Sequence, residues 1–141
     1  MRELPRQLSV EELADLFEGR TRFVERLAEL EDPLGRAREI AATLSDEEKR
    51  EVLDAHPAIG ARKLSARSAA EQGTDEAPEL EELNSAYEEK FGFRFVVFVN
   101  RRPKSELVPV LRERLARSRE EELSTALDQL VAIAEDRWRN S

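Results

Sequence analysis

Apolar residues recur along most of this chain at every third or fourth position, the spacing of the buried face of an α-helix. The last long segment shows one such stripe, formed by Leu123, Leu127, Leu130, Ala134 and Trp138. A second stripe precedes Phe91 and consists of Leu80, Leu83 and Tyr87. The pattern predicts helices over residues 9–18, 21–31, 33–44, 46–55, 78–91, 105–117 and 119–138.

Three of these predicted helices begin with a serine that is followed, three positions later, by a glutamate. This spacing is the capping box, in which the hydroxyl and the carboxylate bond the free amides of the first turn. Asp32 before Pro33 predicts a further start, with Asp32 as the cap. The fold class is therefore all-α, a single-domain multi-helix bundle over residues 1–141. The three capping pairs are Ser9 with Glu12, Ser45 with Glu48, and Ser118 with Glu121.

One segment departs from the helical pattern. Residues 93–99 read Phe-Arg-Phe-Val-Val-Phe-Val, and this aromatic and β-branched run is typical of a buried extended strand. Gly92 before it is most simply a helix stop. No second strand pattern is present to pair with this segment, yet buried main-chain groups need hydrogen-bond partners. A polar ligand, water and neighbouring side chains are all open as the source.

Composition excludes several classes of function. The chain has 141 residues, with 23 Lys and Arg against 31 Asp and Glu, so its net charge is −8. We therefore expect no nucleic acid and no anionic membrane as a partner. The absence of cysteine and the single histidine, His56, exclude thiolate chemistry and histidine-rich metal sites. With no apolar run of about 20 residues and no apolar signal core at the amino terminus, we expect a cytoplasmic protein without a metal.

His56 is the first candidate for chemistry. Because Pro57 follows it, the preceding helix should end at or just before His56. A helix carboxyl end favours the protonated imidazole, which could donate a proton or hold an anion near neutral pH. The alternative is a histidine that only caps the helix.

Two further candidates lie elsewhere in the chain. Ser68, Glu71 and Gln72 place a hydroxyl, a carboxylate and an amide at a predicted helix start, where free amides can bind an anion. Ser68 and Glu71 also match the capping box, which would make them structural. Arg137 lies at the edge of the last apolar stripe, where it could clamp a carboxylate or merely complement the helix end. Tyr87 is expected to be a core anchor whose hydroxyl has a partner.

Taken together and in this order, three motifs resemble the OHCU decarboxylase family. OHCU is 2-oxo-4-hydroxy-4-carboxy-5-ureidoimidazoline, an intermediate in the oxidation of urate to allantoin. The resemblance extends from about the first predicted helix to Arg137. The motifs are His56-Pro57-Ala58-Ile59-Gly60, then Ser68-x-x-Glu71-Gln72, then Leu83-Asn84-x-x-Tyr87-x-x-Lys90-Phe91-Gly92-Phe93-x-Phe95-Val96.

The resemblance implies an all-helical domain, usually a homodimer, that converts OHCU to (S)-allantoin without a metal or organic cofactor. It places His56 and Glu71 on the family's catalytic positions. It also implies that the main chain of the 93–99 segment lines the pocket. The substrate-contacting positions that it implies are Pro57, Ser68, Gln72, Phe95, Val96, Val97, Phe98, Val99 and Arg137.

The chain departs from some relatives in two places. The segment between Gln72 and Leu83 is shorter than in many of them, and the chain ends in Arg139-Asn140-Ser141 rather than in the peroxisomal tripeptide of some eukaryotic members. Two other functions stay open on the residues alone. One is a helical protein-interaction module, and the other is a cofactor-free hydrolase of a related ureide.

Overall fold

The computed structural model describes residues 4–56 and 79–140. Over these ranges it contains helices and no strand, which confirms the all-α prediction. Every predicted helix is present, and the largest difference in bounds is that the second one ends at Ala28 rather than at residue 31. The helices are α1 (Val10–Phe17), α2 (Arg22–Ala28), α3 (Pro33–Thr43), α4 (Asp46–Asp54), α6 (Glu79–Phe91), α7 (Lys104–Leu115) and α8 (Arg119–Arg139).

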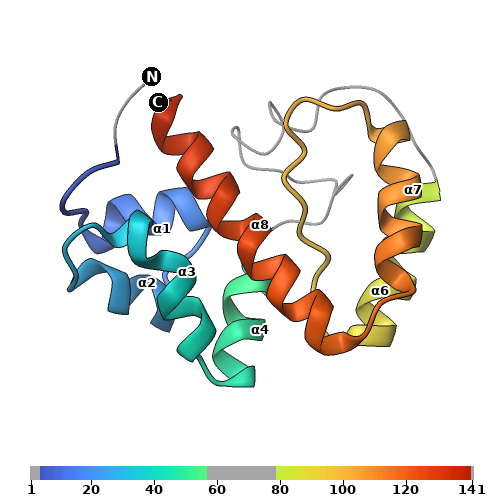
Figure 1. The fold of residues 1–141 in the computed structure, drawn as a ribbon, viewed down its shortest axis with the longest axis horizontal. Coiled ribbons are helices and arrows are strands. Elements are labelled where there is room, and N and C mark those ends of the chain that lie inside the picture. Colours follow the sequence, from blue (N-terminus) through green and yellow to red (C-terminus); the bar gives the residue numbers. More distant parts are fainter. Residues whose placement is uncertain (1–3, 57–78, 141) are drawn as a thin grey trace.

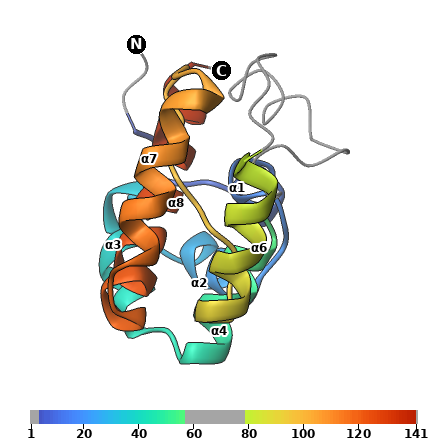
Figure 2. The same ribbon diagram turned by 90° about the vertical axis from the view of Figure 1, so that its right-hand side faces the viewer.

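The long helix α8 runs diagonally through the middle of the molecule (Figure 1). Helices α1, α3 and α4 all pack against it, and α2 packs against α1, α3 and α4. Helices α6 and α7 form a pair at the end of the molecule away from α1, α2 and α3 (Figure 1), and this pair faces the viewer in Figure 2. The 93–99 segment passes between α8 and α7, so it lies where the two groups of helices meet (Figure 1).

The helix starts follow the predicted capping chemistry. At Ser9, Ser45 and Ser118 the hydroxyl accepts from the third amide of the helix, and the glutamate there accepts from the serine amide. Asp32 is the cap residue of α3, but its side chain makes no capping hydrogen bond. Its φ of 52° is left-handed, whereas a capping side chain needs the extended backbone to reach the first-turn amides.

The predicted apolar stripes face the core with two exceptions. Leu127, Leu130 and Ala134 of α8 are buried, while Trp138 is only partly buried at the end of the same stripe. In α6 the neighbouring Asn84 is buried in the place expected for Leu83, which is only partly buried. Gly92 ends α6 with a φ of 80°, a conformation that glycine adopts without strain, as predicted for a helix stop.

The 93–99 segment is extended, and side chains from the surrounding elements bond its main chain. Its aromatic residues Phe93 and Phe95 are each 1% exposed, so water does not reach this part of the backbone freely. Of the three sources that the sequence left open, neighbouring side chains serve at least five of its main-chain groups. Asp54 accepts from the Arg94 amide (3.0 Å), Gln129 accepts from the Phe98 amide (2.8 Å), Arg114 donates to the Val96 carbonyl (2.7 Å), and Arg102 donates to the carbonyls of Phe98 (2.7 Å) and Val99 (3.0 Å).

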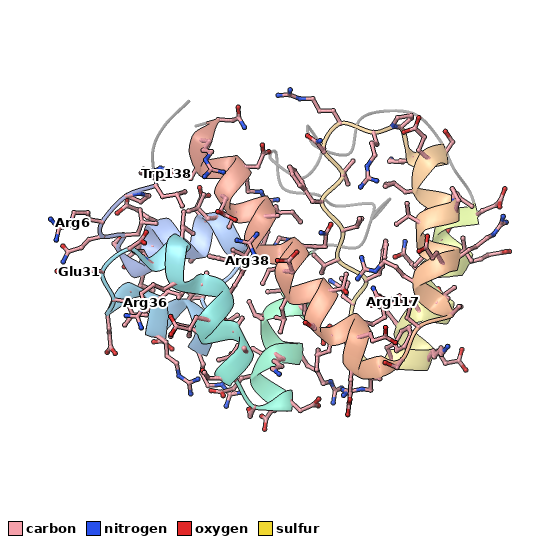
Figure 3. The ribbon with its side chains drawn as sticks, viewed as in Figure 1. Arg6, Glu31, Arg36, Arg38, Arg117 and Trp138 are labelled. Carbon is pink, nitrogen blue, oxygen red and sulfur yellow. The ribbon has the colours of Figure 1, made fainter. Side chains whose placement is uncertain are left out.

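A fully buried carboxylate, that of Glu122 in α8, organises this region. It accepts hydrogen bonds from Tyr87 Oη (2.7 Å), Arg114 Nε (2.7 Å) and Arg117 Nη1 (3.0 Å). Arg117 lies where α7 leads into α8 (Figure 3). Since Arg114 also bonds the Val96 carbonyl, the network ties α6, α7 and α8 to the extended segment.

Tyr87 is the core anchor that the sequence predicts. Its ring is 0% exposed and lies against the rings of Phe91, Phe93 and Phe95, with centroids 4.6, 5.8 and 5.1 Å away. Burial, and then the hydrogen bond to Glu122, raise the pKa of Tyr87 well above its ordinary value. The phenol therefore stays protonated and donates its hydrogen bond to the buried carboxylate of Glu122.

We predict that Glu122→Gln lowers the free energy of unfolding by about 3–5 kcal/mol, because it leaves the buried Arg114 without its counter-ion. Urea denaturation of both proteins measures the difference. The matched control is Glu79→Gln, whose carboxylate pairs with Arg112 at 2.6 Å but with side chains 61% and 62% exposed. Its loss should stay within about 1 kcal/mol. Equal losses in the two variants would contradict the role given to Glu122.

Candidate functional site

His56 lies just beyond the carboxyl end of α4, where the sequence places it. The helix ends at Asp54, and the His56 amide donates to the carbonyl of Leu53 at 3.2 Å. The residue is only 5% exposed. Its imidazole is therefore inside the protein and not on a solvated helix end.

In the part of the chain that the structure describes, three other elements bring charges to His56. Arg137 comes from α8, Glu18 from the end of α1, and Arg94 from the start of the extended segment. Arg94 Nη1 also donates to the main-chain carbonyls of His56 and Asp54. The last turn of α4, the extended segment, α1 and α8 thus converge on one buried histidine.

The charge state of His56 differs from the expectation drawn from the helix dipole. Burial, and after it the positive charge of Arg137, lower the pKa of His56 to about 4, while Glu18 opposes this shift. The expected preference for the protonated imidazole was wrong. The cost of burying a cation next to a second cation exceeds what a helix end contributes, so His56 is neutral near pH 7.

His56 Nε2 is buried, and among residues 4–56 and 79–140 no group forms a hydrogen bond with it. A buried polar atom without a partner costs about 1–3 kcal/mol, so such atoms are uncommon and mark strained or functional positions. In a neutral imidazole one nitrogen donates and the other accepts. This atom is suited to exchange a proton or a hydrogen bond with a bound molecule.

Arg137 is buried and lies deeper than a cation that only complements a helix end. Its side chain is 2% exposed. Nη2 lies 3.0 Å from Oε1 of Glu18, and Nη1 donates to the carbonyl of Leu16 at 3.0 Å. Both contacts come from the carboxyl end of α1, so the guanidinium is held between α8 and α1.

Glu18 is an acidic residue of this cluster that the sequence analysis did not single out. The signal that could have found it is Gly19. A glycine there predicts a helix end, and an acidic residue at that end is out of place because it faces the negative pole of the helix dipole.

The structure brings together only part of the predicted site. Arg137 lies close enough to His56 for its charge to lower the pKa of the imidazole, and Arg94 links His56 to the segment that contains Phe95, Val96, Val97, Phe98 and Val99. In that segment Phe98 is half-buried and the other four are buried. Pro57, Ser68, Glu71 and Gln72 lie outside the described residues, and their roles stay predictions.

A separate groove of about 470 Å³ lies between α3, α4 and α8. It contains none of the predicted site residues. Ala41, Leu123 and Leu127 line it together with charged residues, among them Arg38, which lies between α3 and α8 (Figure 3). Over the described ranges no group of three or more His, Cys, Asp or Glu side chains is placed to hold a metal ion, and no helix there is long and apolar enough to cross a membrane.

Comparison with known proteins points to one family. A family model described as OHCU decarboxylase matches residues 2–139. The chain is 35% identical over 116 residues to the 2-oxo-4-hydroxy-4-carboxy-5-ureidoimidazoline decarboxylase of Haloferax volcanii, a match that covers 76% of this chain and 67% of that protein. It is also 34% identical over 105 residues to the uric acid degradation bifunctional protein of a Bacillus species, strain TB-90.

The match to the Bacillus protein covers 68% of this chain but only 21% of that longer protein. Among solved structures, the fold is similar to that of an OHCU decarboxylase crystallised in the presence of (S)-allantoin. The TM-score is 0.73 at 24% identity, over 89% of this chain and 94% of that one. This similarity shows that the two proteins share the same fold.

The low pKa of His56 predicts a loss of stability in acid. Because the pKa of about 4 in the folded state lies below the ordinary 6.5, the unfolded chain binds the proton more readily between these values. The free energy of unfolding therefore falls as the pH drops through this window, by roughly 2–3 kcal/mol between about pH 7.5 and 4.5. Above this window His56 causes no loss of stability.

The measurement is urea denaturation across this pH range for the wild type and for His56→Gln. Carboxylates also titrate there, but they do so equally in both proteins, so the difference in pH dependence belongs to His56. Parallel stability curves would show that His56 is not a buried neutral histidine.

Proposed function

The chain belongs to the OHCU decarboxylase family, and we propose that it is a carboxy-lyase that converts OHCU to (S)-allantoin and CO₂ in urate degradation. The similarity to the 2-oxo-4-hydroxy-4-carboxy-5-ureidoimidazoline decarboxylase of Haloferax volcanii supports this proposal. The observation in the structure that carries it is the buried His56, whose Nε2 has no hydrogen-bond partner among the described residues and whose imidazole lies beside Arg137.

The substrate explains why few protein groups are needed. The carboxylate of OHCU is bonded to a ring carbon that also carries the hydroxyl group and lies next to a ring C=N bond. When the bond to CO₂ breaks, its electron pair enters this C=N bond, and the ring nitrogen takes up a proton. The substrate thus supplies its own electron sink, which is why we propose that neither a metal nor an organic cofactor takes part.

Two proton movements complete the reaction. The hydroxyl group loses its proton to become the carbonyl of allantoin, and the neighbouring ring carbon gains a proton on one face. A neutral imidazole can accept the first proton and deliver the second, because one of its nitrogens accepts while the other donates. We assign this role to His56, with Glu71 as the second catalytic residue on the strength of the family resemblance.

The positive charge of Arg137 has a different task. Negative charge develops on the ring as CO₂ leaves, and a cation already fixed in a buried site stabilises such charge without reorganising. Arg137 is 2% exposed, and its contacts with Glu18 and with the Leu16 carbonyl hold it in place, which supports this assignment. We propose that Pro57, Ser68, Gln72 and the main chain of Phe95 to Val99 hold the ureido and ring polar groups.

The assembly and location of the protein are part of the same proposal. We propose that residues 1–141 form one domain, that the protein is a cytoplasmic homodimer, and that nucleic acid and membranes are not its partners. The family resemblance supports the dimer, and the net charge of −8 supports the exclusion of anionic partners.

Sedimentation velocity checks the predicted dimer. It should give a single species with twice the 16.2 kDa mass of the chain at micromolar concentration. A species with the mass of one chain, unchanged as the concentration rises, would contradict the dimer but leave the proposed reaction intact.

We predict that His56→Ala and Glu71→Ala each lower the rate of enzymatic decarboxylation by about 10²–10⁴-fold, the usual contribution of a general acid or base. OHCU also decays without an enzyme, so the measurement is circular dichroism of the allantoin formed from fresh OHCU. The wild type should give the S enantiomer, and the variants should approach the racemic product. Glu79→Gln, which changes an exposed carboxylate, is the control and should keep wild-type activity.

Near-full stereospecific turnover by either variant would remove that residue from the mechanism. A wild-type protein that yields only racemic allantoin would contradict the decarboxylase proposal as a whole. Release of ammonia or urea would instead indicate a hydrolase of a related ureide.

A further inference from the structure

We propose that Glu18 is the positioning residue of this site, whose carboxylate holds the guanidinium of Arg137 in place beside His56. This inference rests on the proposed function, because Arg137 is the residue proposed to stabilise the negative charge that develops during decarboxylation. It adds a residue that neither the motifs nor the family resemblance identified.

Glu18 and the main chain at the end of α1 fix the position of the Arg137 guanidinium. Arg137 Nη2 lies 3.0 Å from Glu18 Oε1, and Nη1 donates to the carbonyl of Leu16 at 3.0 Å. Both partners lie within two residues of Phe17, where α1 ends. A planar guanidinium that is bound through two of its nitrogens has little freedom to rotate, so α1 sets the orientation of a side chain that α8 carries.

Both side chains of this ion pair are largely shielded from water. The Arg137 side chain is 2% exposed and that of Glu18 is 14% exposed. A buried cation that loses its counter-ion must move toward water or bring water in. The exposed pair of Arg6 and Glu31, with side chains 86% and 72% exposed, has no such constraint and lies at the edge of the molecule (Figure 3).

The local structure disfavours a glutamate at position 18. Its φ of 64° and ψ of 20° are left-handed, a conformation that glycine adopts far more readily, and Gly19 is the next residue along the chain. Its negative charge also lies at the negative end of the α1 dipole. A residue that is unfavourable locally for two reasons indicates a role outside its own helix. The contact with Arg137 is such a role.

Glu18 also acts on His56 through charge. Among the described residues, the charged groups that act on this imidazole are Arg137 from α8, Glu18 from α1 and Arg94 from the extended segment. The two cations favour the neutral imidazole, and Glu18 opposes them. By compensating Arg137, Glu18 keeps His56 closer to the range in which it can exchange a proton with a substrate.

The first test is a double-mutant cycle on enantioselective activity with Glu18→Gln, Arg137→Gln and the double variant. Glu18→Gln should lower kcat by about 10²-fold, the loss that follows when a reacting group is displaced by about 1 Å. If Glu18 acts through Arg137, adding Glu18→Gln to Arg137→Gln should cause no further loss. The control Glu31→Gln should keep wild-type kcat, because its carboxylate is exposed and pairs with Arg6.

A second measurement does not depend on activity. The chain has one histidine, so its ring proton signals in an NMR titration report His56 alone. Glu18→Gln should lower the pKa of His56 and Arg137→Gln should raise it. If Glu18→Gln folds poorly, Glu18→Gly removes the carboxylate while suiting the left-handed backbone, and it should reproduce the loss of kcat and the pKa shift.

The outcomes separate this inference from the proposed function. Wild-type kcat in folded Glu18→Gln or Glu18→Gly, at a temperature where both are stable, would overturn the role of Glu18 and leave the decarboxylase proposal standing. Independent, multiplicative losses in the double variant would also overturn it. Racemic product from the wild type would contradict the proposed function, while the histidine titration would still show whether Glu18 and Arg137 act on His56 as a pair.

Discussion

The structure depends on one constraint. An extended run of main chain, residues 93–99, is buried among helices, and residues 4–56 and 79–140 provide no strand to pair with it. A helix satisfies its own amides and carbonyls, but the 93–99 segment has to obtain partners from elsewhere. Asp54, Gln129, Arg114 and Arg102 supply them as side-chain donors and acceptors. Because these residues belong to α4, α8, α7 and the loop before α7, bonding the segment also determines how these elements lie around it.

Buried charge pairs complete the arrangement at both ends of α8. Near its start, Glu122 accepts hydrogen bonds from Tyr87, Arg114 and Arg117 and stabilises the fold. Near its end, Arg137 contacts Glu18 beside a histidine whose Nε2 has no partner among the described residues. Each network includes a buried nitrogen without a hydrogen-bond partner among the described residues, Arg114 Nη2 in the first and His56 Nε2 in the second. The second is the candidate site because an imidazole can exchange a proton, whereas a guanidinium stays protonated.

Local chemistry was predictable wherever neighbouring residues along the chain decide it. The capping pairs, the helix stop at Gly92 and the burial of Tyr87 each depend on contacts within a few residues or on a regular apolar stripe, and each was confirmed. The charge of His56 was not predictable in this way. The sequence shows only the helix end beside it, whereas burial and the approach of Arg137 from α8 decide its pKa.

By itself, the sequence determined that this protein is helical, where its helices begin, that residues 93–99 are extended, and which family it belongs to. These features are carried by periodicity, caps and ordered motifs, which need no knowledge of distant contacts. Only the tertiary structure decided which side chains bond the buried segment, that His56 is neutral, and that Glu18 is the partner of Arg137. Those outcomes depend on desolvation and on charges more than a hundred residues apart, and no local pattern records them.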